Sequence, residues 1–215
     1  IQYYLDIEND FLNINQLLNR FLQIAFLKYE CLNCRLEKRV YRQGFCKACF
    51  FELPSTGAWI MRPELSRAHL GKEDRDLAYE RSVQLQPHIV YLANSSHLKV
   101  GVTRKQQIQT RWIDQGAHSA MEIVEVPNRY LAGITELALK KHVADKTNWR
   151  KMLSGDIEEV DLVAWRDKLR PYIPTEAQQF FIENNRVTGF NFPVYQYPKK
   201  PKSLNIVKAH FYVGK

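Results

Sequence analysis

The four cysteines of this chain restrict its fold more than any other feature, because they occur in two closely spaced pairs. Cys31 and Cys34 form the first pair, Cys46 and Cys49 form the second, and eleven residues separate the pairs. Two residues between cysteines allow both thiolates to face one ion from a tight turn, and two such turns complete a tetrahedral site. The sequence therefore predicts a zinc module over residues 31–52, with disulfides or a redox or iron site as the alternatives.

This predicted zinc site is structural, because cysteine fills all four ligand positions and leaves none open for substrate. In a module with little core of its own, metal binding would supply the folding energy. The stretch between the pairs, residues 35–45, has about the length of a short hairpin, with its turn at residues 41–44.

Basic and aromatic residues surround the cysteines. They are Lys28, Arg35, Lys38, Arg39, Arg42, Lys47, Tyr41, Phe45, Phe50 and Phe51. One interpretation is contact with nucleic-acid phosphates, with the aromatic rings available for base stacking. The alternative is a solvated surface whose aromatic residues pack over the metal site.

Charge and apolar runs limit the class of protein. The net charge of +8 over 215 residues favours polyanionic partners, namely nucleic acid, the ribosome or an acidic membrane surface. The longest apolar run, residues 21–27, is far below the ~20 residues needed to span a bilayer. No secretory signal is recognisable. We therefore expect a cytoplasmic protein that is not inserted in a membrane, and a chain that is processed, trimmed or incomplete because it begins with Ile1.

We expect an α+β protein in five segments. These are a β-rich segment at 1–30, the zinc module at 31–52, a connector with at most one helix (near 72–84) at 53–87, a central domain at 88–155, and C-terminal helices with a β tail at 156–215. In the first segment, short apolar runs between turn-forming residues predict a few strands and one helical turn.

The central domain opens with two apolar strands, residues 89–93 and 98–103, joined by four turn-forming or polar residues. A helix should follow from a capping box at Thr103 and Gln106 and end at Gly116. The remaining expected elements are a strand at 121–126, helices at 131–144, 156–170 and 175–185 (capped by Thr175), and strand-like pieces at 192–197 and 206–213.

Ile89-Val90-Tyr91 followed by Lys99-Val100-Gly101 resembles the two signature strands of the GIY-YIG nuclease superfamily, in a divergent form. Arg111, Glu136 and Asn148 follow at intervals similar to those of the arginine, glutamate and asparagine of that superfamily. Most of the chain resembles an uncharacterised bacterial family that joins a four-cysteine module to such a domain. The resemblance implies a three-stranded antiparallel sheet flanked by helices.

The resemblance also implies roles for these residues in phosphodiester cleavage. Tyr91 would help to deprotonate the attacking water, and Arg111 would stabilise charge on the phosphoryl oxygens. Glu136 would bind one Mg²⁺ or Mn²⁺ ion, and Asn148 would hold local structure or phosphate. A single carboxylate suffices for such an ion when substrate phosphate completes its coordination.

The chain departs from the superfamily pattern at Ile89, which replaces a glycine, and at Lys99, which replaces a tyrosine but suits phosphate contact. The alternative of a domain that binds nucleic acid without cleaving it therefore stays open. Each site residue also has a structural interpretation. Tyr91 could be a core residue, Lys99 a solvated lysine, Arg111 a partner of Asp114 or Asp145, Glu136 a surface acid, and Asn148 a turn or helix cap.

The preferred hypothesis is a metal-dependent endonuclease acting on DNA, with a branched or single-stranded form of DNA among the substrates considered. The alternatives are a non-catalytic RNA-binding or ribosome-associated protein, and a structural interaction protein. A second group of basic residues could track phosphates or form a solvated helix end. They are Lys140, Lys141, Arg150 and Lys151.

Overall fold

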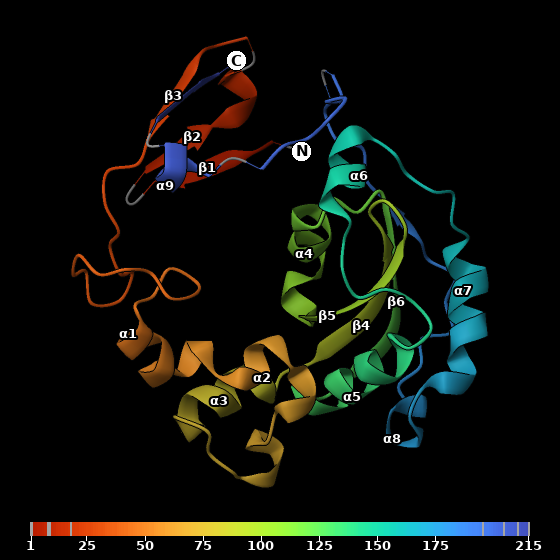
Figure 1. Ribbon diagram of the computed structural model, residues 1–215. Helices are drawn as coiled ribbons and strands as arrows, with labels where there is room; N and C mark the ends of the chain where they lie inside the picture. Colours follow the sequence, from red (N-terminus) through yellow and green to blue (C-terminus); the bar gives the residue numbers. More distant parts are fainter. Residues whose placement is uncertain are drawn as a thin grey trace.

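The computed structural model describes residues 2–7, 10–17, 19–194, 196–203, 205–209 and 211–214, and it shows an α+β protein with antiparallel sheets (Figure 1). Within these residues the largest sheet has the strand order β5-β4-β6-β7. Its strands are β4 (His88–Asn94), β5 (Leu98–Arg104), β6 (Ser119–Val126) and β7 (Thr188–Gly189). Three strands match the expected ones, and β7 is an addition that the sequence analysis missed.

β4 lies at the centre of this sheet, with a strand on each side. All seven of its residues are buried, as expected for an apolar run covered on both faces. It pairs antiparallel with β5 and β6, and Tyr91 lies opposite Gly101 of β5. The strand–turn–strand prediction is therefore confirmed.

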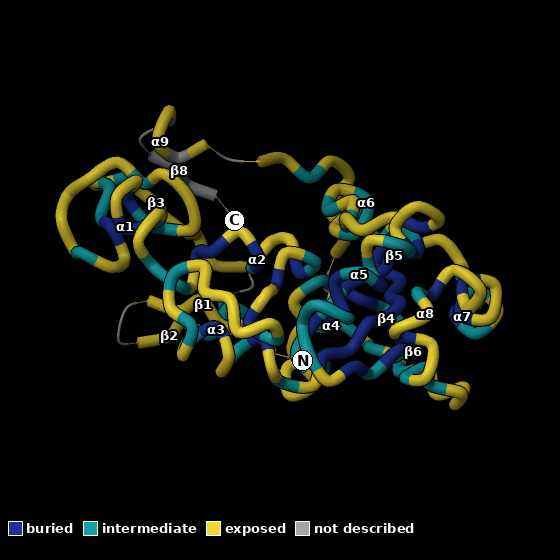
Figure 2. The backbone as a smooth tube through the Cα atoms, turned by 90° about the horizontal axis from the view of Figure 1, so that it is seen from below, coloured by how far each residue is buried: buried dark blue, intermediate teal, exposed yellow. Residues whose placement is uncertain are grey.

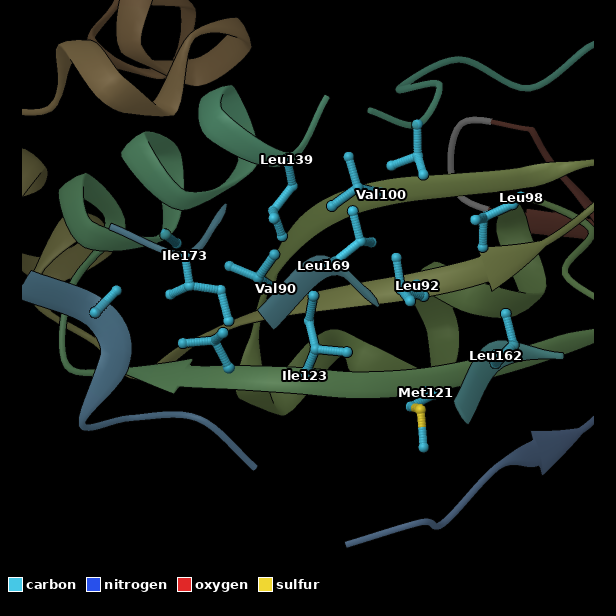
Figure 3. Packing of buried hydrophobic residues seen from close by; sticks show 14 of the residues in the cluster. Val90, Leu92, Leu98, Val100, Met121, Ile123, Leu139, Leu162, Leu169 and Ile173 are labelled. Carbon is cyan, nitrogen blue, oxygen red and sulfur yellow. The ribbon is translucent and has the colours of Figure 1, made fainter. Parts of the chain in front are cut away.

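Helices cover both faces of the sheet. They are α4 (Ile108–Asp114), α5 (Arg129–Leu139), α7 (Leu162–Leu169) and α8 (Thr175–Gln178). α5, α7 and α8 cover one face, where Leu139 and Leu169 lie over Val90 in the main core (Figure 3). α4 covers the other face, where Trp112 packs against Tyr91. Helices from opposite faces can therefore reach the same edge of the sheet.

Residues 53–87 are folded against α5 instead of forming an open connector. They contain η2 (Pro54–Thr56), α2 (Ala58–Met61), η3 (Pro63–Leu65), η4 (Ala68–Leu70) and α3 (Leu77–Gln84). α3 lies within the expected range, but the expectation of at most one helix is wrong. The short turns depend on contacts distant in sequence: a Cβ added to Gly133 of α5 would lie 2.2 Å from the backbone nitrogen of Glu64.

The N-terminal segment forms small sheets away from the central one (Figure 1). Its elements are β1 (Tyr4–Ile7), β2 (Asp10–Asn13), η1 (Ile14–Leu17) and β3 (Leu22–Ala25). β1 pairs with β2, and β3 pairs with β8 (Phe211–Gly214) from the other end of the chain. β1 and β3 are exposed along their length, unlike the dark-blue strands of the central sheet in Figure 2. A few strands and one helical turn are confirmed for the described part of this segment.

The helix after β5 does not begin with the expected capping box. Thr103 lies within β5, paired with Ile89, so its backbone belongs to the strand ladder. A 3-10 turn, η5 (Lys105–Gln107), follows, and α4 begins without a side-chain cap. Its predicted end is confirmed, because Gly116 adopts φ +62° just after the helix.

The later helices are shorter than expected. α5 ends at Leu139, before residue 144, and α6 (Trp149–Ser154) was not predicted. Residues 156–170 contain α7 and the start of η6 (Arg170–Tyr172), while α8 ends well before residue 185 and has Pro174, not Thr175, at its N-cap. No helix in the described part of the chain is long and apolar enough to cross a membrane.

The expected strand pieces near the C-terminus are confirmed only in part. Residues 192–197 contain no strand among those described, and residue 195 lies outside the description. Residues 206–213 contain a short helix, α9 (Ile206–Ala209), and most of β8, with residue 210 outside the description.

Candidate functional site

A cavity of about 410 Å³ lies beside the end of β5, the edge strand of the sheet. One side is formed by the end of β5, by α4 and by α5, and the other by α2, η3 and α3. Its charged lining residues are Arg104, Arg111, Arg129 and Glu136. Arg111 and Glu136 come from helices on opposite faces of the sheet, and both line this cavity.

Glu136 lies on α5 and is half-buried in this cavity. Burial raises the pKa of its carboxyl, and the positive charges of Lys140 and Arg129 offset this only in part. Among the described residues the carboxylate forms no salt bridge and accepts no hydrogen bond from a side chain. Glu136 is therefore a half-buried acid whose oxygens are free to bind a ligand.

Arg111 lies on α4 and is exposed. Neither Asp114 nor Asp145 forms a salt bridge with it in the described part of the chain, so the pairing considered from the sequence is absent. An exposed guanidinium without an acid partner keeps its donors available for an anion.

Tyr91 is buried behind the cavity, and its hydroxyl is paired with the side-chain amide of Gln115. The hydroxyl oxygen lies 3.0 Å from Oε1 and 2.8 Å from Nε2 of Gln115. A Cβ added to Gly101 would lie 2.6 Å from this hydroxyl oxygen, so the tyrosine ring requires glycine opposite it. Burial raises the pKa of Tyr91, opposed by the Gln115 hydrogen bond and by the charge of Arg111.

Lys99 is also buried, with only 4% of its surface exposed, which contradicts the solvated-lysine interpretation. Its ammonium donates a hydrogen bond of 2.8 Å to Oγ1 of Thr147. Burial, followed by the charge of Arg111, lowers its pKa to about 8, whereas Asp145 and Glu136 act in the opposite direction. Lys99 therefore lies within the electric field of the site without lining its cavity.

Asn148 is not brought into the cavity. It is exposed and caps α6, with its Oδ1 accepting the backbone N–H of Lys151 at 3.3 Å. The cap considered from the sequence is therefore what the structure shows, and its neighbour Thr147 makes the contact with Lys99. Arg111 and Glu136 line the same cavity, whereas Tyr91 and Lys99 are buried and are not among its lining residues.

Two arginines of the cavity were missed by the sequence analysis. Arg129 donates hydrogen bonds to the carbonyl oxygens of Trp59 at 3.2 Å and Ile60 at 2.7 Å. Burial lowers its pKa to about 10, although Glu136 acts in the opposite direction. Arg129 precedes Glu136 by seven positions on α5, which places both on one helix face and was a readable signal. Arg104 ends β5 and carried no comparable signal.

The basic residues after Glu136 differ in their surroundings. Lys151 lies 3.7 Å from Asp156 and 3.5 Å from Glu158 in two salt bridges. Arg150 lies over the ring of Trp149, 4.2 Å from its centroid. Lys140 and Lys141 are exposed at the end of α5, as expected for a solvated helix end.

The four cysteines form a separate cluster. Their sulphur atoms all lie within 4.8 Å of one another, and none is in a disulfide. The backbone N–H of Cys46 lies 3.3 Å from the sulphur of Cys31 and lowers the pKa of that thiol to about 6. Asn33 donates to the sulphur of Cys49 at 3.4 Å, although burial and the neighbouring thiols raise the pKa of Cys49 to about 11. Four thiols in this arrangement could bind a metal ion such as zinc.

The surface of this cluster has both arrangements considered from the sequence, namely aromatic rings that pack together and basic side chains that are exposed. The rings of Tyr41, Phe50 and Phe51 pack on one another, with centroids 5.3 to 5.7 Å apart. Arg42 lies over Tyr41, and Arg35 is 3.8 Å from Glu30. Lys38, Arg39 and Lys47 are exposed, and none forms a salt bridge in the described part of the chain.

The family model described as "Protein of unknown function (DUF2797)" matches residues 19–215, and the chain belongs to this family. Searches of curated proteins and of solved structures found no match. The match spans both the cysteine cluster and the cavity residues.

Proposed function

We propose that this member of the DUF2797 family is a metal-dependent, GIY-YIG-like nuclease that binds nucleic-acid phosphate in the cavity at the edge of β5. The observation that carries the proposal is the meeting of Arg111 and Glu136 in one cavity. They come from opposite faces of the sheet, and neither has a charged partner within 4.0 Å among the described residues.

The charge of the cavity favours a phosphodiester. Three arginines and one carboxylate give it a net positive charge when all four are ionised. Guanidinium groups match phosphate oxygens with two parallel hydrogen bonds, which a lysine cannot provide. Arg111 is the most available of the three, because Arg129 already donates to backbone carbonyls and Arg104 donates to Gln107 at 2.9 Å.

Glu136 fits a divalent ion only together with substrate. Mg²⁺ and Mn²⁺ prefer oxygen ligands, and Glu136 is the one carboxylate that lines the cavity. Three nearby arginines disfavour a bare cation, and a bound phosphate would reduce this positive charge while adding oxygen ligands. Once bound, such an ion would polarise the phosphoryl group.

Tyr91 and Lys99 act in this proposal as positioning residues. Tyr91, with a raised pKa and a hydroxyl paired with Gln115, is less readily deprotonated than the role implied by the sequence resemblance requires. It instead ties the end of α4, and with it Arg111, to the central strand. Lys99 holds Thr147 and contributes positive charge behind the cavity.

For the cysteine cluster we propose a structural zinc ion. Zinc bound by thiolates lies about 2.3 Å from each sulphur, which separates neighbouring sulphurs by roughly 3.8 Å in a tetrahedron. The sulphurs already lie within 4.8 Å of one another, so small side-chain movements suffice. All four positions are filled by protein, so the ion would stabilise the fold without contacting substrate.

The unpaired basic side chains of the cysteine cluster favour a second candidate, an RNA-binding or ribosome-associated protein that does not cleave. Lys38, Arg39 and Lys47 are exposed there and remote in sequence from the cavity. Binding through this surface alone would weaken strongly with increasing salt. Substitution of Arg111 or Glu136 would not change it.

The test is cleavage of DNA and RNA oligonucleotides in the presence of Mg²⁺ or Mn²⁺ by the full chain. Glu136→Gln keeps the shape of the side chain and removes its charge, and we expect it to reduce cleavage at least a hundredfold. Glu176→Gln, at an exposed position on α8, is the matched control and should leave the rate unchanged. Equal cleavage by wild type and Glu136→Gln would contradict the proposal, and salt-sensitive binding without cleavage would favour the second candidate.

A further inference from the structure

The cavity has two chemically different walls. The charged residues come from β5, α4 and α5, whereas the lining residues from α2, η3 and α3, here called the connector wall, are mostly apolar. Its lining residues are Ile60, Met61, Pro63, Tyr79 and Val83. Figure 1 shows α2 and α3 next to α5, outside the sheet.

The connector wall is fixed to α5 through α2 and η3. Gly133 allows the backbones of α5 and η3 to touch, with a Cβ position only 2.2 Å from the nitrogen of Glu64. Arg129 binds the carbonyl oxygens of Trp59 and Ile60, and the Trp59 side chain is 2% exposed. A wall held by backbone contact and by a buried tryptophan does not open as a mobile lid.

Two buried polar residues fix α3 in the same wall. The carboxylate of Glu80 accepts the backbone N–H groups of Asp74 and Arg75 at 2.7 to 3.2 Å. Gln84 accepts the N–H of Ala68 at 3.0 Å, and both side chains are 1% exposed. Tyr79, which directly precedes Glu80 on α3, therefore has a fixed backbone position beside the cavity.

The size and polarity of the cavity suit one nucleotide. Sites for small ligands commonly have volumes of ~300–1,000 Å³, and a volume of about 410 Å³ lies at the small end of that range. Arginines on one wall match a phosphate, and an aromatic ring with apolar neighbours on the other matches the face of a base. A stacked base pair with two backbones would need the connector wall to move.

We propose that the cavity takes one unpaired nucleotide of a single strand, with its phosphate on Arg111 and its base against Tyr79 and Met61. The inference rests on the proposed function and names its substrate class. A continuous duplex is excluded by the connector wall, whereas single-stranded DNA and RNA share the required chemistry.

The experiment measures binding and Mg²⁺-dependent cleavage of one oligonucleotide sequence as single-stranded DNA, single-stranded RNA and blunt DNA duplex. The full chain should bind and cut at least one single strand about tenfold or more in preference to the duplex. Tyr79→Ala should weaken single-strand binding about tenfold, since stacking of one base on an aromatic ring is worth ~1–3 kcal/mol. Tyr79→Phe keeps the ring and should retain binding.

Tyr172→Ala, an exposed aromatic on η6, is the matched control, and circular dichroism of each variant confirms folding. Preference for duplex, with both substrates still dependent on Arg111 and Glu136, would overturn the inference and leave the proposed function intact. Unchanged single-strand binding by folded Tyr79→Ala would also overturn it. Absence of binding and cleavage with every substrate would remove the proposed function and the inference together.

Discussion

The four-cysteine module and the sheet domain are stabilised in different ways. In the module, residues 31–52, the buried cluster consists of Cys31, Cys46 and Cys49, with Phe45 and Leu53 packed beside them. The sheet domain, formed by the β5-β4-β6-β7 sheet and its helices, has apolar cores on both faces. Burial of apolar surface can hold the second region without help, whereas the first has too little of it. The module should therefore depend on its ligand, and the cavity should not.

The largest expected effect comes from removing the proposed zinc ion. Chelation, or Cys46→Ala, should abolish tight zinc binding and make residues 31–52 sensitive to protease, because structural zinc contributes roughly 10–16 kcal/mol in small modules. The thermal transition of the sheet domain should shift little. Limited proteolysis with mass spectrometry and a metal assay would measure this.

Lys47→Ala, at an exposed position between two of the cysteines, is the control and should bind one zinc like the wild type. Loss of protection in the sheet domain together with the module would show that the two regions fold as one unit and would break the comparison.

A smaller effect is expected from the buried charge of Lys99. Its pKa is lowered to about 8 from 10.5, so between these pH values the unfolded chain binds more protons at this position than the folded chain. Stability attributable to Lys99 should therefore rise from pH 8 to pH 10.5, by up to about 3 kcal/mol, and be constant below pH 8. Urea unfolding of wild type and Lys99→Met across this range isolates the effect. A constant difference between the two proteins would show that Lys99 is not desolvated.

The smallest effect concerns the contact between α5 and the connector wall. In Gly133→Ala the added methyl group meets the backbone of Pro63 and Glu64, and overpacking of this kind costs about 1–3 kcal/mol. Denaturant unfolding would measure the loss, with the exposed Leu137→Ala on the same helix as control. Unchanged stability in Gly133→Ala would mean that the connector wall moves easily, against the account of a fixed cavity.

The sequence was a good guide where structure depends on local pattern. β4 and β5 follow from apolar runs around a short turn, and Gly116 ends α4 because left-handed backbone favours glycine. The paired cysteines likewise predicted their own cluster. The prediction at Thr103 failed because strand pairing with Ile89 outcompeted a local capping pattern.

The connector wall and Arg104 of the cavity could not be predicted from the sequence in the same way. The turns in residues 53–87 exist because of contacts with α5, such as the one at Gly133, and these are invisible in a local pattern. Arg104 becomes a site residue only when the edge of β5 is placed beside α4 and the wall. Asn148 is the opposite case. Its spacing from Glu136 in the sequence predicted a place in the site, but in the structure it caps α6 outside the cavity.

The central claim is that Arg111 and Glu136 form one phosphate site, and a crystal structure with Mn²⁺ and a single-stranded oligonucleotide tests it most directly. The account predicts an anomalous manganese peak at the Glu136 carboxylate and a backbone phosphate on Arg111, inside the cavity. An oligonucleotide bound only over the four-cysteine module, with no manganese at Glu136, would contradict it.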